Sequence, residues 1–242
     1  MTNRARVGRL LYPLGLLLCC CAPAQTNAAR QVDSTAILNK IDAAVKARFD
    51  GIQGYTDIEH YTVFRSGDQV HPVAEMSVKT TYNRDTGKSY AILSASGSSL
   101  IRNLVLSSVL DNEKHVNEPG VREGAWINTA NYVMTVKPGG PQTMDGRDCV
   151  AVTIKPRRKE PYLLDGTLWV DEEDGKIVHI EGTASKSSSL FTGPTKMMRQ
   201  YTNVDGFAQA THARAEADSG LFGQTVVTID YRDYQIQLGQ HR

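Results

Sequence analysis

The pattern of apolar and polar positions predicts one amphipathic helix followed by a long β region. From residue 33 to Phe49 apolar side chains recur three or four positions apart, and Asp33 or Ser34 can cap the start of the helix. Asp50-Gly51 ends this pattern. Because the apolar side chains form a single stripe, we expect the helix to pack against another part of the protein.

After Tyr55 the spacing of apolar residues changes from helical to alternating. Runs of β-branched and aromatic residues alternate with polar ones, and turn signals separate the runs at short intervals. The turn signals are Ser66-Gly67-Asp68, Asp85-Thr86-Gly87, Asp145-Gly146, Asp165-Gly166, Asp174-Gly175 and Asp205-Gly206. Since no long helical crossover separates the runs, the pattern predicts eight or more strands joined as hairpins in one antiparallel sheet.

One face of the predicted sheet is aliphatic and the other is mixed and polar. Alternate positions in several runs carry Val, Ile or Leu, as in Leu168-Trp169-Val170-Asp171. This arrangement is typical of a sheet that curls around an apolar interior. The residues predicted to line that interior are Val152, Ile154, Leu168, Val170, Val178, Ile180, Val227 and Ile229.

Residues 99–110 interrupt the strand pattern and predict a short, strongly apolar helix. Its apolar face would contain Leu100, Ile101, Leu104 and Val105. The charged stretch that continues to Gly124 predicts an exposed loop. The helix can fill the open side of the sheet as core, or it can cover a ligand cavity as a movable lid. Both interpretations place it on the concave face.

The first 24 residues have the order of segments found in a secretory signal. Arginines at positions 4, 6 and 9 precede the apolar run 10–21, and Ala22-Pro23-Ala24 has small residues at both recognition positions. An apolar run of about a dozen residues is too short to span a hydrocarbon core of ~30 Å. We therefore predict a signal peptide over 1–24 that is cleaved after Ala24, a polar tether over 25–31, and one domain over 32–242.

Removing the predicted signal changes the charge balance. The 242-residue chain has 27 Lys+Arg and 26 Asp+Glu, a net charge of +1. Residues 1–24 contain three arginines and no acidic residue, which leaves 27 − 3 = 24 basic residues against 26 acidic ones, a net charge of −2. Neither balance indicates a nucleic-acid partner.

The cysteines indicate an export compartment and a fold without disulfides. Cys19, Cys20 and Cys21 end the apolar run, so Cys149 is the one cysteine of the predicted mature chain. It lies in an alternating run, where we expect it to be a small packed side chain. An exported chain without internal bridges points to a bacterial periplasm. Lipidation of Cys19, Cys20 or Cys21 would add a membrane anchor, but none of the three follows the Gly, Ala or Ser that a lipobox requires.

The sequence contains no motif that indicates catalysis, a cofactor or a metal. Its six histidines are scattered, and no G-x-S-x-G, H-x-x-x-H, C-x-x-C or Gly-rich phosphate loop occurs. We therefore predict a protein that is not an enzyme and needs no cofactor. The concentrated charge run is Lys155, Arg157, Arg158 and Lys159. It is either a solvated loop or a contact for anionic lipid headgroups or a partner protein.

Several strand-and-turn motifs between residues 131 and 234 resemble those of the periplasmic lipoprotein carrier superfamily, the LolA/LolB/RseB-like half-barrels. More narrowly, the chain looks like the bacterial proteins labelled outer-membrane lipoprotein-sorting proteins. The matching motifs are Asn131-Tyr132, Asp145-Gly146-Arg147-Asp148-Cys149, Ile154-Lys155-Pro156, Gly166-Thr167-Leu168-Trp169-Val170-Asp171, Val204-Asp205-Gly206-Phe207 and Ile229-Asp230-Tyr231-Arg232-Asp233-Tyr234.

The resemblance implies a mainly β (α+β) fold, an antiparallel unclosed half-barrel of about 10–11 strands with helices over its concave face. It also implies a periplasmic, monomeric carrier that binds a lipid acyl chain or a lipoprotein in an apolar cavity. An alternative implied by the RseB-like relatives is a sensor that binds a membrane-anchored regulatory protein. These two functions differ in whether the ligand is an acyl chain or a polypeptide.

Overall fold

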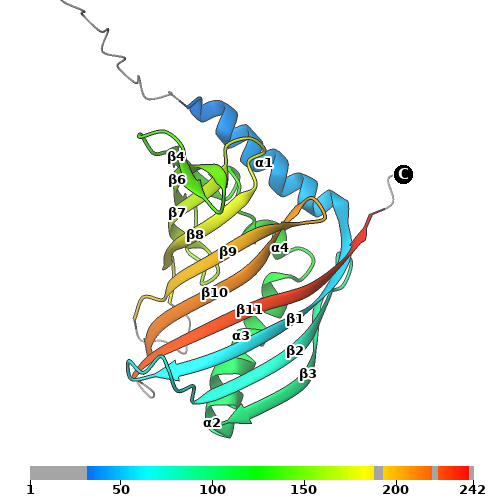
Figure 1. Cartoon of the computed structure of the whole chain (residues 1–242), viewed down its shortest axis with the longest axis vertical. Helices are drawn as coiled ribbons and strands as arrows, with labels where there is room; N and C mark the ends of the chain where they lie inside the picture. Colours follow the sequence, from blue (N-terminus) through cyan, green and yellow to red (C-terminus); the bar gives the residue numbers. More distant parts are fainter. Residues whose placement is uncertain (1–31, 188–192, 220–222, 240–242) are drawn as a thin grey trace, which may run out of the picture.

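The computed structural model describes residues 32–187, 193–219 and 223–239 (Figure 1). The predicted signal peptide over 1–24, its cleavage after Ala24, the tether over 25–31 and the cysteines Cys19, Cys20 and Cys21 lie outside the described residues. No helix in the described part of the chain is both long enough and apolar enough to cross a membrane.

One antiparallel sheet of eleven strands forms most of the structure. Along the sheet the order is β3-β2-β1-β11-β10-β9-β8-β7-β6-β4, and β5 pairs with β6, so β3 and β4 are edges and the barrel is unclosed. The predicted unclosed, antiparallel half-barrel is therefore confirmed. The strands are β1 Ile52–Arg65, β2 Ala74–Asn83, β3 Gly87–Gly97, β4 Tyr132–Val136, β5 Gln142–Met144, β6 Arg147–Pro156, β7 Leu164–Asp171, β8 Ile177–Ala184, β9 Lys196–Val204, β10 Phe207–Ser219 and β11 Gly223–Leu238.

Helix α1 (Ser34–Gly51) begins where the sequence predicts. The Asp33 carboxylate accepts hydrogen bonds from the backbone N–H groups of Thr35 (2.9 Å) and Ala36 (3.2 Å), which satisfies two of the free donors at the helix start. The helix buries Ile37 and Ile41 against the half of the sheet that contains β6, β7 and β8. This first apolar cluster contains Ile37, Ile41, Tyr132, Val150, Val152, Ile154, Leu163, Leu164, Leu168, Val170 and Ile180.

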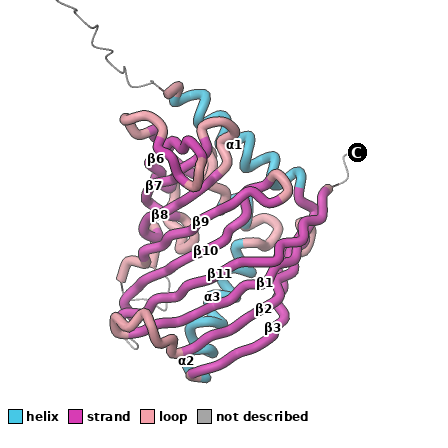
Figure 2. Tube along the Cα trace, viewed as in Figure 1, coloured by secondary structure: helices cyan, strands magenta, loops and turns pink. Residues whose placement is uncertain are grey.

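The inserted helix covers the other half of the sheet. It runs without a break through α2 (Ser99–Ile101), the π-helical turn η1 (Arg102–Leu106) and α3 (Ser107–Val116). Figure 2 shows it behind β11, β1, β2 and β3, on the opposite half of the molecule from β6 and β7. The second apolar cluster, beneath this helix, contains Tyr61, Val63, Ala74, Met76, Val78, Ile101, Val105, Leu106, Ala213, Val227 and Ile229.

Two local expectations were wrong. The stretch that was expected to be an exposed loop continues α3 to Val116 and contains the short helix α4 (Arg122–Ala125). Asp165-Gly166, expected to be a turn, lies inside β7, where Gly166 pairs with Gly182 of β8. The glycine is needed there for close approach of the two backbones, because a Cβ on Gly166 would lie 2.1 Å from the carbonyl oxygen of Glu181.

The other five turn signals join strands. Asp145 and Asp205 have φ angles of 49° and 50°, and each is followed by a glycine with positive φ. This is the geometry that Asp-Gly supplies in two-residue hairpin turns. The predicted packed state of Cys149 is also confirmed, since its thiol is free and fully buried.

We expect Gly166→Ala to lower the free energy of unfolding by about 2 kcal/mol or more, because the new methyl group forces the β7 and β8 backbones apart. Urea unfolding measures this change. Gly193→Ala is the matched control: nothing lies within 4 Å of its Cβ position, so its effect should stay within about 0.5–1 kcal/mol. Equal effects of the two substitutions would contradict the close pairing of Gly166 with Gly182.

Candidate functional site

The helix formed by α2, η1 and α3, here called the cover helix, presents an apolar face to the sheet. Ile101, Val105 and Leu106 are 2%, 4% and 0% exposed and belong to the second apolar cluster. Leu100 and Leu104, expected on the same face, are 57% and 38% exposed. The buried face is centred on Ile101 and Val105, four positions apart, so that Leu100 and Leu104 lie at its exposed side, and the π-helical turn, which adds a residue to the turn, brings Leu106 onto the buried face.

The residues predicted to line one interior are divided between two packed clusters. Val227 and Ile229 lie beneath the cover helix. Val152, Ile154, Leu168, Val170 and Ile180 lie beneath α1 in the first cluster, whereas Val178 is buried but belongs to neither. The side chains of these clusters pack between the helices and the sheet.

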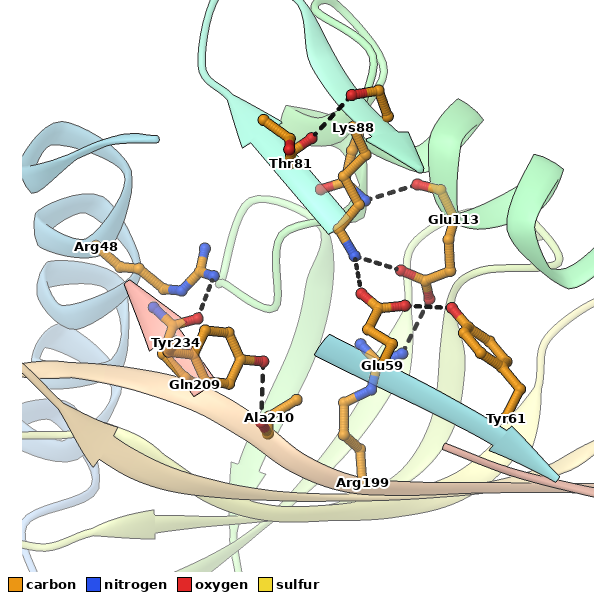
Figure 3. A network of polar contacts seen from close by, with 12 residues as sticks. Arg48, Glu59, Tyr61, Thr81, Lys88, Glu113, Arg199, Gln209, Ala210 and Tyr234 are labelled. Atoms are coloured by element: carbon orange, nitrogen blue, oxygen red, sulfur yellow. Dashed lines mark hydrogen bonds and ion pairs between the residues drawn. The ribbon is translucent and has the colours of Figure 1, made fainter. Parts of the chain in front are cut away.

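Charged side chains of three strands pair with one another and with the cover helix. Lys88 of β3 lies 3.5 Å from Glu59 of β1 and 3.2 Å from Glu113 of α3. Arg199 of β9 lies 3.0 Å from the other carboxylate oxygen of Glu113, and the Tyr61 hydroxyl donates to Glu59. Figure 3 shows these side chains converging from three strands and the cover helix. We call Glu59, Lys88, Glu113 and Arg199 the ionic latch.

The latch is buried enough for its pairing to matter. Glu59 and Lys88 are 1% and 7% exposed at their side chains, and removing one partner of a buried pair leaves an uncompensated charge, typically at a cost of about 3–5 kcal/mol. Burial alone would raise the pKa of Glu113, but Lys88 and Arg199 outweigh it and hold the pKa at about 2. Glu113 therefore stays ionised, and paired, over the physiological pH range.

The residues predicted to line the interior are all aliphatic, so the prediction did not include the ionic latch. In β1 the inward positions are Tyr55, Asp57, Glu59, Tyr61 and Val63, which alternate with less buried residues. The available signal was the period of two: Asp57 and Glu59 share a face with Tyr61 and Val63. Two carboxylates on the buried face of a central strand indicate a polar interior.

The predicted basic patch is partly structural. Arg158 donates to the Asn131 side chain (2.9 Å) and to the backbone of Gly124, and Arg157 donates to the Thr129 carbonyl (3.1 Å). These bonds hold the segment that precedes β4. Lys155 and Lys159 are exposed, so a contact of the patch with an anionic partner stays a prediction.

Two surface cavities lie away from the cover helix. One, of about 430 Å³, is polar and is bordered by Arg147, Asp171 and Tyr201; the other, of about 280 Å³, is mainly apolar and lies between α1 and the β9–β10 turn. In the described ranges no three His, Cys, Asp or Glu side chains are grouped so that they could hold a metal ion.

Asp57 is a buried acid that is not part of the ionic latch. It is 2% exposed, and neither of its carboxylate oxygens has a hydrogen bond of good geometry among the described residues. Burial, and then the charge of nearby Glu59, raise the pKa of Asp57 from 3.8 to about 7. The Tyr234 hydroxyl, which donates to the Ala210 carbonyl, lies near enough to Asp57 to lower its pKa in part. The folded protein therefore holds a proton on Asp57 at acidic pH that the unfolded chain has already released.

This difference predicts a pH dependence of stability. Between about pH 4 and pH 7 the native state binds the extra proton, so the contribution of Asp57 to the free energy of unfolding falls as pH rises. Asp57→Asn removes this fall. The free energy of unfolding of the variant, relative to that of the wild type, should therefore rise by up to about 4 kcal/mol between about pH 4 and pH 7. Urea unfolding of both proteins at pH 4 to 8 measures this difference. The opposite contribution of Glu113 is present in both proteins and therefore cancels. A difference independent of pH would contradict the raised pKa.

No protein-family model matches the sequence, and no curated protein matches it. Solved structures do match. A LolA superfamily protein from Nitrosomonas europaea is 13% identical, with 86% of this chain and 94% of that chain covered and a TM-score of 0.45. A DUF1329 family protein from Desulfovibrio piger is 12% identical, with 87% and 96% covered and a TM-score of 0.44.

A domain assigned to outer membrane lipoprotein-sorting proteins, from Vibrio parahaemolyticus, is 13% identical, with 84% of this chain and 93% of that chain covered and a TM-score of 0.47. These solved structures include the kinds of protein that the sequence motifs resemble.

Proposed function

We propose that the chain is an exported, non-enzymatic periplasmic carrier that holds an acyl chain of a lipid or lipoprotein beneath the cover helix. The observation that carries this proposal is the apolar face of Ile101, Val105 and Leu106, which closes one half of an unclosed sheet over an apolar cluster. In the proposal the helix moves away and the acyl chain takes its place on the sheet.

The connection after the cover helix suits such a movement. The chain turns there at Gly120, which has a φ of 87° and nothing within 4 Å of its Cβ position. At the start of the helix Gly97 pairs with Ala74 at the end of β3, so the helix would move about this end. The side chains Leu100 and Leu104 on its outer face are exposed. Apart from apolar contacts, the pairs of Glu113 with Lys88 and Arg199 hold the helix to the sheet in the part of the chain that the structure describes.

The apolar stabilisation by the cover helix and that by a bound acyl chain are similar in size. Three buried side chains of the cover helix contribute about 1.5–3 kcal/mol each, or about 5–9 kcal/mol together. An acyl chain gains about 0.8 kcal/mol per buried methylene, so roughly ten methylenes gain about 8 kcal/mol. A long acyl chain can therefore offset the apolar contacts of the helix, whereas a short one cannot, and the ion pairs of Glu113 with Lys88 and Arg199 add to what the chain must offset.

The first test is to purify the mature protein from cells and to extract it with organic solvent for lipid mass spectrometry. A stoichiometric phospholipid, fatty acid or acylated peptide would support the carrier function and name the ligand class. An empty extract from well-folded protein, together with no uptake of added lipid, would contradict it.

We expect Glu113→Gln to loosen the cover helix and to accelerate acyl uptake by about tenfold, since it removes the charge that Lys88 and Arg199 hold. Stopped-flow fluorescence with a labelled fatty acid measures uptake, and hydrogen exchange should rise in residues 99–116 but not in β6 and β7. Glu118→Gln is the matched control, because Glu118 pairs only with exposed His115 among the described contacts. Unchanged uptake in Glu113→Gln would show that the cover helix is fixed core.

A second substitution pair separates the inner from the outer face of the cover helix. Val105→Asp places a carboxylate in the apolar cluster, and Leu104→Asp places one at the surface. We expect Val105→Asp to abolish acyl binding and to lower the free energy of unfolding by about 3 kcal/mol or more, while Leu104→Asp changes both little. Binding assays and urea unfolding measure the two effects. A larger loss of acyl binding in Leu104→Asp would place the ligand outside the cover helix.

A second candidate function is a sensor domain that binds a membrane-anchored regulatory protein. The observation that favours it is a group of exposed apolar side chains at the free edge strand β3 and the adjoining helix, namely Ile92, Leu93, Leu100 and Leu104. Residues 89–101 contain no charged side chain, and an edge strand without charges can pair with an extended segment of another protein. Loss of partner binding in Leu93→Lys, with lipid content unchanged, would favour this function.

A further inference from the structure

Four side chains on the inner face of the sheet have buried polar atoms without a hydrogen-bond partner of good geometry. Among the described residues these unpartnered atoms are both carboxylate oxygens of Asp57, the hydroxyls of Thr80 and Tyr90, and the Nε2 of Gln209. Asp57, Thr80 and Gln209 are at most 2% exposed. Native proteins satisfy nearly all such groups, so each one requires an explanation, such as a bound water or ligand.

Three of the four groups form a row across adjacent strands. Asp57 of β1 is directly opposite Thr80 of β2, and Thr80 is directly opposite Tyr90 of β3. Residues opposite each other in an antiparallel pair share a face, with Cβ atoms about 4.5–5.5 Å apart. The three side chains therefore lie side by side beneath the cover helix, next to the ionic latch.

Gln209 extends the polar surface on the other side of β1. Its Oε1 accepts a hydrogen bond from Arg48 of α1 (3.0 Å), which leaves Nε2 as an unused donor. Figure 3 shows Gln209 beside Tyr234, and the Tyr234 hydroxyl donates to the Ala210 carbonyl (2.9 Å). Tyr234 belongs to β11, which lies between β1 and β10 in the sheet.

The charges around the row determine which groups it can accept. The two cations of the latch, Lys88 and Arg199, are already paired with Glu59 and Glu113. Arg48 is occupied by the Ala208 carbonyl and Gln209. Asp57 is left as an acid without a cation, and an ionised carboxylate only accepts hydrogen bonds. An anionic group placed here would meet Asp57 and Glu59 with no free positive charge to offset them.

We propose that the row Asp57, Thr80 and Tyr90, here called the polar row, binds the polar head of the acylated ligand and selects heads that donate hydrogen bonds. An amide N–H or a hydroxyl fits this site, whereas a free carboxylate or phosphate does not. The inference rests on the proposed carrier function and narrows its ligand to amide-linked or hydroxyl-bearing acyl compounds. The acyl chain extends from the polar row into the second apolar cluster.

The test compares two probes that share one acyl chain. Palmitoyl ethanolamide carries an amide N–H and a hydroxyl, and palmitate carries a carboxylate. Equilibrium dialysis of each radiolabelled probe against the full mature protein is carried out at pH 8 and below the micellar concentration. We expect the wild type to bind the ethanolamide at least about tenfold more tightly than palmitate.

Asp57→Asn should reduce this preference to less than about threefold, because the carboxamide both donates and accepts. Asp165→Asn, at an exposed position of β7, is the matched control and should keep the wild-type preference. The wild-type comparison needs no variant, and thermal unfolding by circular dichroism verifies that each variant folds.

The outcomes distinguish this inference from the carrier function. Equal binding of both probes by the wild type would overturn the polar row as a head-group site, and ordered water would then explain the row, while the carrier function would stand. A preference that persists in Asp57→Asn would likewise overturn it. If neither probe binds, the carrier function fails, and the head-group inference fails with it.

Discussion

Inside the curved sheet, Lys88 is buried, with 7% of its side chain exposed, and must be neutralised there, while Arg199, at 30% exposure, pairs with the carboxylate of Glu113 that Lys88 also contacts. Glu59 of β1 and Glu113 of the cover helix supply the opposite charges. Because these four side chains come from β1, β3, β9 and α3, their pairing fixes the distance between both halves of the sheet and the helix above it. Removing one of the four side chains leaves an uncompensated charge, so the four depend on one another.

The apolar packing is arranged around this charged centre. Helix α1 packs on β6, β7 and β8, and the cover helix packs on β1, β2 and β11. The ionic latch joins the cover helix to β1, β3 and β9. The two helices differ in how firmly they are attached. Two side chains of helix α1 also donate hydrogen bonds: Lys40 to the Glu172 carbonyl, and Arg48 to the Ala208 carbonyl of β10. The cover helix depends on its apolar face and on Glu113.

A carrier needs a binding surface that is protected when empty and accessible when loaded. In the proposed carrier, the apolar face beneath the cover helix would meet both requirements, because the acyl chain would bury apolar area in place of the helix. The polar row would then add selectivity at the level of the head group. Its unsatisfied groups are tolerated in the closed form at a cost in stability, which is a common property of binding sites.

Alternation and turn chemistry in the sequence predicted the hairpins, because Asp-Gly at positions such as Asp145-Gly146 and Asp205-Gly206 supplies the positive φ angles of tight turns. The same signal failed at Asp165-Gly166. There the glycine serves close contact with Gly182 across the strand pair. A dipeptide pattern cannot distinguish a turn from a close approach, since the second depends on the strand that lies opposite.

Local periodicity was enough to predict the elements: the capped helix after Asp33, the antiparallel strands, and which residues of each strand share a face. What those faces contact depends on the tertiary structure. The aliphatic positions are divided between two clusters, Leu104 lies on the exposed side of the cover helix, and Glu59, Lys88, Glu113 and Arg199 lie together. These residues are up to 140 positions apart along the chain, and contacts over such separations depend on strand order and register, which local periodicity does not specify.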